Sequence, residues 1–234
     1  MPRKGMLEGG IMPCIVGTMV LVTGTMLVAL PLGVFGAVYL TEYARPSVLT
    51  RLIRLSIVNL AGVPSVVFGL FGLGVFVLLC RFQASILSGA LTLALLVLPL
   101  VITATEEALR TVPLSFREAS MALGATRWQT IRKVILPNAM PGILTGAILS
   151  LSRAAGETAP ILLTVAAFYL PELPKKLSDQ VMTLSYHLYI ISTQVPGAPD
   201  RVQWGTAFVL LALVLGANSV AIALRMSLRR RRKW

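Results

Sequence analysis

The stretch that decides the fold is residues 11–40, IMPCIVGTMVLVTGTMLVALPLGVFGAVYL, which contains no charged side chain. A membrane-spanning helix needs about 20 consecutive apolar residues. This run exceeds that length, so we expect it to tilt, to kink at Pro31 or to project from the bilayer. Similar runs follow at 56–79, 84–105, 141–167 and 204–224. A backbone in lipid must satisfy its own hydrogen bonds, so the sequence predicts an all-α, polytopic transmembrane bundle with five spans.

Composition supports this prediction and excludes other classes of protein. Apolar residues make up 56% of the 234 residues, charged residues only 13%, and the mean hydropathy is +0.82. A soluble domain carries about 25% charged residues. The chain has no Gly-x-x-x-x-Gly-Lys-Ser/Thr loop, and His187 is its single histidine. We therefore predict a non-catalytic membrane subunit that binds no nucleotide, metal or other cofactor itself.

The basic residues predict the orientation of the spans. Three segments on one side of the predicted bundle, 41–55, 106–140 and the tail from Arg225 to Lys233, carry 14 of the 21 Lys and Arg residues. Positive charge accumulates on cytoplasmic loops, so these segments and the C-terminus are expected in the cytoplasm of a prokaryotic cell. The N-terminus then comes out external, which suggests a further span upstream. The basic tail fits an anchor at an anionic lipid surface better than a nucleic-acid site.

The predicted cytoplasmic loop 106–140 has an amphipathic pattern. Apolar residues recur at helical spacing: Phe116, Ala119, Leu123, Trp128, Ile131 and Ile135. Gly124 predicts a turn between two short helices, and Leu136-Pro137 predicts the end of the second one. Such a helix pair could dock in a groove of a partner protein or simply lie at the membrane interface.

Arg153 and Glu157 form the second candidate site. They lie four residues apart, on one helix face, near the middle of the predicted span 141–167. A charge at that depth is costly, so it should face the bundle interior or a water-filled path. The pair could be an internal ion pair that joins helices, or Arg153 could bind an anion, because a guanidinium matches the oxygens of phosphate. Asn59 and Thr158 could line the same path or form interhelical hydrogen bonds.

The loop resembles the EAA loop of ABC importer permeases. Glu118, Ala119 and Ser120 are followed at the family's spacing by Gly124, Val134, Leu136 and Pro137. Ser120 stands where the family has Ala, and Val134 where it has Ile. In the family this loop forms coupling helices that dock on the ATP-binding subunit, so the resemblance assigns this role to Glu118, Ala119, Ser120, Gly124, Leu136 and Pro137.

Three more stretches resemble phosphate permeases of the PstA type: 9–18, 31–44 and Gly156-Glu157-Thr158-Ala159-Pro160. The resemblance implies a phosphate importer in which Arg153 and Glu157 lie in the transport path. It further implies a second permease, two ATP-binding subunits that carry ATP and magnesium, and an external phosphate-binding protein. Family members usually have six spans, which agrees with a missing first span. The alternatives are a permease for molybdate or sulfate and a membrane scaffold for an ATPase.

Overall fold

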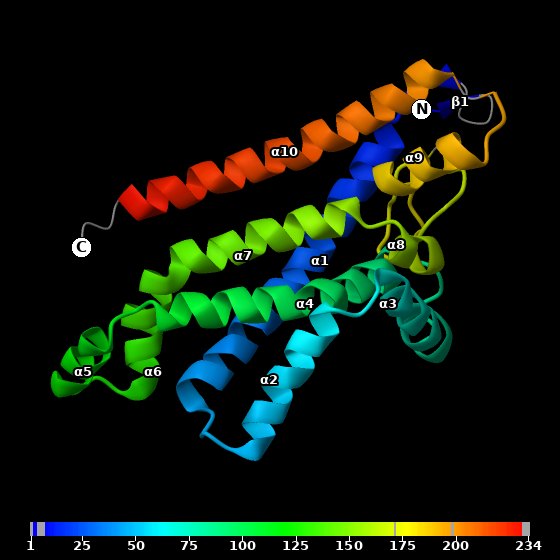
Figure 1. Cartoon of the computed structure of the whole chain (residues 1–234). Coiled ribbons are helices and arrows are strands. Elements are labelled where there is room, and N and C mark those ends of the chain that lie inside the picture. Colours follow the sequence, from blue (N-terminus) through cyan, green and yellow to red (C-terminus); the bar gives the residue numbers. More distant parts are fainter. Residues whose placement is uncertain (1, 4–7, 171, 198, 231–234) are drawn as a thin grey trace. The chain divides into compact units, whose positions relative to one another are not determined.

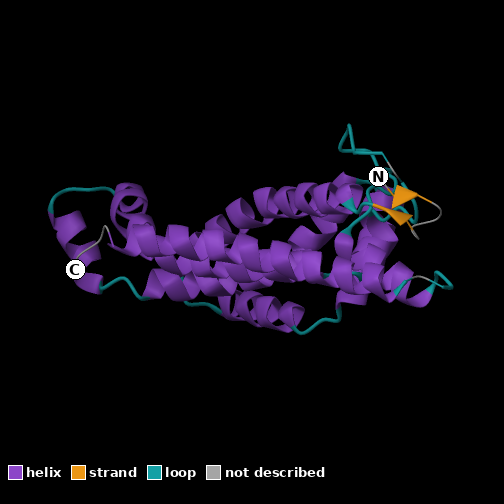
Figure 2. Ribbon diagram, turned by 90° about the horizontal axis from the view of Figure 1, so that it is seen from above, coloured by secondary structure: helices purple, strands orange, loops and turns teal. Residues whose placement is uncertain are grey.

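The computed structural model describes residues 2–3, 8–170, 172–197 and 199–230, which are mostly helical (Figures 1 and 2). A short antiparallel pair of strands, β1 (Pro2–Arg3) and β2 (Glu8–Gly9), precedes the helices. The helical segments, with η denoting a π-helical one, are α1 (Met12–Val38), η2 (Tyr39–Tyr43), α2 (Val48–Ala61), α3 (Ser65–Gly72), η3 (Leu73–Leu79), α4 (Ile86–Arg110), α5 (Leu114–Ala122), α6 (Arg127–Thr130), η4 (Ile131–Ile135), α7 (Leu136–Gly156), α8 (Ala159–Thr164), α9 (Leu184–Thr193) and α10 (Asp200–Arg230).

Within the described residues, four continuous helical stretches are long and apolar enough to cross a membrane: Met12–Tyr43, Ile86–Arg110, Arg127–Gly156 and Asp200–Ser227. Each overlaps one predicted span, and the helix through Pro31 continues to the end of α1. A bent pair of helices can supply a fifth span. The prediction of an all-α bundle with several apolar helices is therefore confirmed.

The predicted span 56–79 is not one straight helix. It begins inside α2 and continues in α3 and η3, and the axis bends by 103° at the break between them. Gly62 caps α2 by donating its backbone N–H to Asn59 O, and Pro64 follows two residues later. Proline disfavours the helical conformation of the residue before it and has no N–H to donate, so the helix stops here.

The prediction that Leu136-Pro137 ends a helix is wrong. The helix that begins at Arg127 continues through Pro137 to Gly156. Just before the proline, η4 makes a wide turn in which Leu136 N–H donates to Ile131 O, five residues back. A wider turn accommodates a proline ring better than an ordinary α-helical turn, which explains why the helix is not interrupted.

The chain divides into two compact units, and α1, α4, α7 and α10 each contribute to both. Unit 1 consists of Met1–Val28, Val63–Val97 and Leu151–Asn218, and its core includes Leu21, Leu93 and Ile161. Its helices approach closely at glycines. A Cβ on Gly69 would lie 2.9 Å from Pro160 Cα, and one on Gly89 2.6 Å from Val165 Cγ1, so α3 and α4 both need glycine where they meet α8 or the residue just after it.

Unit 2 consists of Ala29–Gly62, Leu98–Ser150 and Ser219–Trp234. Its core joins the end of α1 and η2 to α4 and to η4, through the fully buried Ala37, Leu109, Ile131 and Ile135. The loop 106–140 therefore packs on the spans of its own unit through Ile131 and Ile135. Of the other predicted apolar positions in the loop, Phe116 is half-buried against the same core, whereas Ala119, Leu123 and Trp128 are exposed.

Candidate transport site and coupling surface

The Arg153–Glu157 pair lies where α7 ends. Arg153 is in the last turn of α7, and its Nε is 3.5 Å from Glu157 Oε1. The prediction that Arg153 lies near the middle of a span is wrong. The predicted span 141–167 is interrupted between Gly156 and Ala159, so Arg153 lies near the end of a helix. A cation in the last turn of a helix also interacts favourably with the helix dipole.

Local sequence explains the interruption. Gly156 is exposed and a Cβ there would meet nothing within 4 Å, so neither packing nor a side chain holds the helix together at this point. Thr158 then takes a non-helical backbone conformation, and its carbonyl accepts from Leu162 N–H to begin α8. Pro160 follows at the start of α8, where its missing N–H costs nothing. Glu157 and Thr158 are thus the linker between two helices.

Contacts within unit 1 hold this linker in place. Ser185 Oγ, in α9, donates to the carbonyl oxygen of Glu157 over 2.8 Å. One residue before Arg153, Ser152 Oγ donates to Asn218 Oδ1 of α10 over 2.7 Å. Hydrogen bonds therefore connect the segments on both sides of the pair to two other helices, and within the described part of the chain the charged ends are joined by their mutual ion pair.

The exposure of the two side chains determines what they can do. Arg153 is 35% exposed and Glu157 16% exposed, so the guanidinium is reachable from outside the chain while the carboxylate is mostly covered. An ion pair of this kind leaves several N–H donors of the arginine free of the carboxylate, because a guanidinium has five. The arrangement can bind an oxyanion at the exposed side of Arg153.

The remaining predicted path residues differ in their setting. Thr158 is half-buried next to Glu157. Asn59 is exposed in the last turn of α2 and belongs to unit 2, where its backbone carbonyl accepts the N–H of Gly62. The structure brings Arg153 and Glu157 into contact, Thr158 follows Glu157 in the linker, and the transport roles of all four residues stay predictions.

The loop 106–140 forms the helix pair that its sequence predicts. Between α5 and α6, Gly124 has a φ of 81°, which glycine adopts without strain. Thr126 and Gln129 form a capping box that begins α6. Ser120 Oγ and Thr130 Oγ1 lie 2.9 Å apart and tie α5 to α6. The conformation of the pair is thus built into its own side chains.

An apolar surface faces outward on this helix pair. Leu123 is 88% exposed, Leu114 69%, Met121 50% and Trp128 47%, and Glu118 and Ala119 are exposed beside them. We call these six residues the coupling surface. Clusters of exposed large apolar side chains mark sites of protein association. Leu136 and Pro137, by contrast, are half-buried in the continuing helix, and Leu136 packs against the core of unit 2.

Sequence reasoning missed two charged residues next to this surface. Glu42 is only 7% exposed and lies 3.0 Å from Arg117 of α5, measured from Oε1 to Nη1. Glu42 could have been identified from the sequence, because a carboxylate only two residues after the uncharged run 11–40 is unusual enough to indicate a partner. Arg117 offered no comparable signal, because it is one of several basic residues in its loop.

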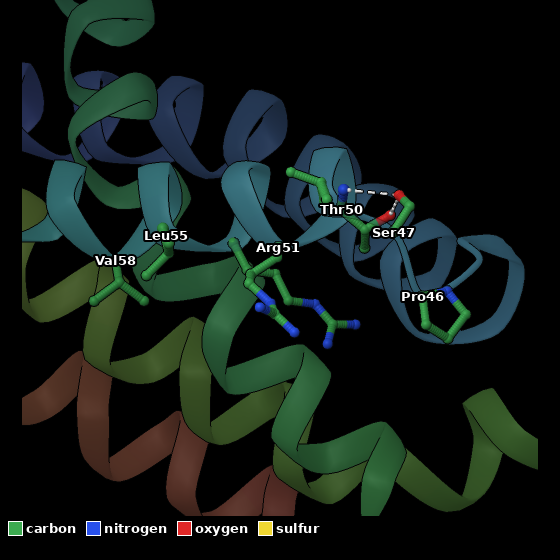
Figure 3. Close-up of a pocket in the computed structure, with 8 residues that line it drawn as sticks. Pro46, Ser47, Thr50, Arg51, Leu55 and Val58 are labelled. Atoms are coloured by element: carbon green, nitrogen blue, oxygen red, sulfur yellow. Dashed lines mark hydrogen bonds between the residues drawn. The ribbon is translucent and has the colours of Figure 1, made fainter.

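Figure 3 shows a pocket that is formed by neither the coupling surface nor the Arg153–Glu157 pair. Its volume is about 600 Å³, and it is lined by residues of the turn before α2 and of α2 itself: Pro46, Ser47, Val48, Thr50, Arg51, Arg54, Leu55 and Val58. None of the predicted path residues lines it. Over the described residues, no group of three or more His, Cys, Asp or Glu could hold a metal ion.

Comparison with known proteins agrees with this architecture. Two solved structures share the fold: an inward-facing MetNI methionine ABC transporter, with a TM-score of 0.69, 20% identity and 94% of each chain covered, and a bacterial ABC transporter for alginate import, with a TM-score of 0.68, 16% identity and 91% and 79% covered.

Closer relatives are found by sequence. The phosphate transport system permease protein PstA 1 of Mycobacterium tuberculosis is 38% identical over 225 residues, which are 96% of this chain and 72% of that protein. A probable PstA of Methanocaldococcus jannaschii is 38% identical over 212 residues, covering 89% and 73%. The probable ABC transporter permease YqgI of Bacillus subtilis is 37% identical over 221 residues, covering 88% and 75%.

The family described as "binding-protein-dependent transport system inner membrane component" matches residues 29–233, a range that includes both the coupling surface and the Arg153–Glu157 pair. With several apolar helices long enough to cross a membrane, and with relatives of this identity along most of its length, the chain belongs to this family of multi-pass ABC transporter permease subunits.

Proposed function

We propose that this chain is a permease subunit of an ATP-driven importer of inorganic phosphate. The observation that carries the proposal is Arg153 at the helix break, a permanently charged fork that is 35% exposed, next to Ser152, which hydrogen-bonds to α10. Planar N–H donors bind phosphate oxygens in pairs. The names of the relatives in Mycobacterium tuberculosis and Methanocaldococcus jannaschii support phosphate as the anion.

The proposed assembly contains a second permease subunit, two ATP-binding subunits and an extracytoplasmic phosphate-binding protein, with the coupling surface and the C-terminus in the cytoplasm. ATP and magnesium would be bound by the partner subunits. Closure of these subunits would displace α5 and α6, and the spans attached to them would switch access from one face of the membrane to the other. Phosphate would pass Arg153 during this switch.

Uptake of labelled phosphate by the complex in lipid vesicles tests the substrate. We expect phosphate uptake to require ATP and the binding protein. An excess of sulfate or molybdate should reduce this uptake only slightly. Strong competition by sulfate or molybdate would instead indicate a permease for another oxyanion. ATP hydrolysis by the complex without uptake of any of the three anions would favour a scaffold.

The docking role of the coupling surface has its own test. Glu118→Arg reverses an exposed charge within this surface, and Glu172→Arg reverses one in unit 1, where the side chain is 73% exposed. We expect Glu118→Arg to reduce co-purification of the ATP-binding subunits or the uptake per ATP hydrolysed, with the chain still inserted. Glu172→Arg should leave co-purification unchanged. Equal behaviour of both variants would contradict the docking role.

A further inference from the structure

A mostly buried ion pair connects the helix pair of the loop to the end of the first long helix. Glu42 lies in η2, which continues α1, and Arg117 lies in α5 beside the coupling surface. Their side chains are 7% and 17% exposed, and Nη1 lies 3.0 Å from Oε1 without hydrogen-bond geometry. Removing one member would leave the other charge buried and unpaired, which is strongly unfavourable. The two segments are therefore expected to move together.

Two further contacts strengthen this connection. Arg117 Nη2 donates to Leu109 O, near the end of α4, over 2.9 Å. Arg127, the first residue of α6, places its guanidinium carbon 5.4 Å from the centre of the Tyr43 ring, within the range of a cation–π interaction. Both helices of the loop thus contact η2: Arg117 of α5 contacts Glu42, and Arg127 of α6 contacts Tyr43.

The same segment is also attached to α2. Arg54 Nη2 donates to Leu40 O over 2.7 Å, and Arg54 Nε lies 3.5 Å from Glu106 Oε1 in α4. Leu40 and Glu42 both belong to η2, and all of these residues belong to unit 2. A displacement of α5 can therefore reach α1 and α2 through charged contacts, in addition to the apolar core of the unit.

We propose that Glu42 and Arg117 are positioning residues that pass the displacement of α5 to η2 and α1, and so couple ATP hydrolysis to transport. This inference rests on the proposed function of the chain as an importer permease. It assigns to the pair a role distinct from docking, because neither residue is part of the coupling surface. A purely structural pair would affect assembly and leave the energetic coupling unchanged.

The experiment uses the assembled complex in lipid vesicles and measures ATP hydrolysed per phosphate taken up. Glu42→Gln removes the charge at nearly constant volume. The double variant Glu42→Leu with Arg117→Met replaces the pair by apolar side chains and leaves no unpaired buried charge, so it is expected to fold and assemble. Glu107→Gln, which neutralises an exposed carboxylate on α4 of the same unit, is the matched control.

We expect the double variant to assemble in normal yield and to hydrolyse at least about fivefold more ATP per phosphate than the wild type, the lower end of a typical coupling effect. Glu42→Gln should shift the ratio in the same direction, and Glu107→Gln should not shift it. A wild-type ratio in the double variant would overturn the inference and leave the proposed function intact. A wild-type complex that takes up no phosphate would instead refute the proposed function.

Discussion

Replacement of Arg153 separates an anion site from a structural ion pair, because the structure limits how much stability the pair can supply. Arg153 is 35% exposed and the nearest charged atoms are 3.5 Å apart. A pair with one partly exposed member contributes about 0–1 kcal/mol to the folding free energy. Arg153→Gln with Glu157→Gln leaves no unpaired carboxylate and should assemble nearly as well as the wild type, whereas Arg153→Gln alone also leaves Glu157, 16% exposed, without its partner and should assemble in a lower yield.

The expected effect on transport is much larger. A hydrogen bond to a charged group contributes about 1.5–3 kcal/mol, which corresponds to about 10- to 150-fold in binding or rate. Arg153→Gln should reduce phosphate uptake by at least this factor. Arg153→Lys should transport poorly as well, because an ammonium keeps the charge and loses the paired geometry. Glu157→Gln should be milder if Glu157 only orients the arginine.

The assay measures initial phosphate uptake, complex yield and the midpoint of thermal unfolding for each variant. Lys175→Gln, which breaks the exposed Lys175–Glu172 pair at 3.6 Å, is the control for loss of an ion pair outside the site. The decisive variant is Arg153→Gln with Glu157→Gln. If this double change restores uptake, the pair is structural and the anion site is refuted.

Three more predictions address other parts of the chain. Gly124→Val should weaken binding of the ATP-binding subunits by about 5- to 30-fold, since a left-handed backbone costs about 1–2 kcal/mol, whereas Gly124→Asn should bind normally; equal affinities in a titration would contradict this. Burial lowers the pKa of His187 below its usual value of 6.5, so the folded state favours the neutral imidazole, and the stability of the folded state should decrease as the pH is lowered through 6.5; thermal unfolding of His187→Gln should depend less on pH, and an unchanged pH dependence would contradict this. A reporter fused at Arg127 should be cytoplasmic and one at Pro174 external, and a cytoplasmic signal at Pro174 would refute the orientation.

Local properties of the sequence were sufficient to predict the membrane-length helices and the EAA-like loop. The apolar runs predicted where membrane-length helices occur, because apolar length and internal hydrogen bonding are properties of a segment by itself. The turn at Gly124 was likewise predictable, since glycine alone adopts its φ of 81° without strain. The resemblance of residues 118–137 to the EAA loop depends on residue types and their spacing, so it indicates the family without any knowledge of long-range contacts.

Only the tertiary structure decided how these segments bend and which charges meet. The prediction that Pro137 ends a helix failed because a wide turn before it accommodates the proline. The bend of 103° within the predicted span 56–79 was not predicted. Glu42 and Arg117 are far apart in the chain, so no helical spacing could pair them. Their contact depends on the packing of η2 against α5, which the core of unit 2 determines through long-range contacts rather than local periodicity.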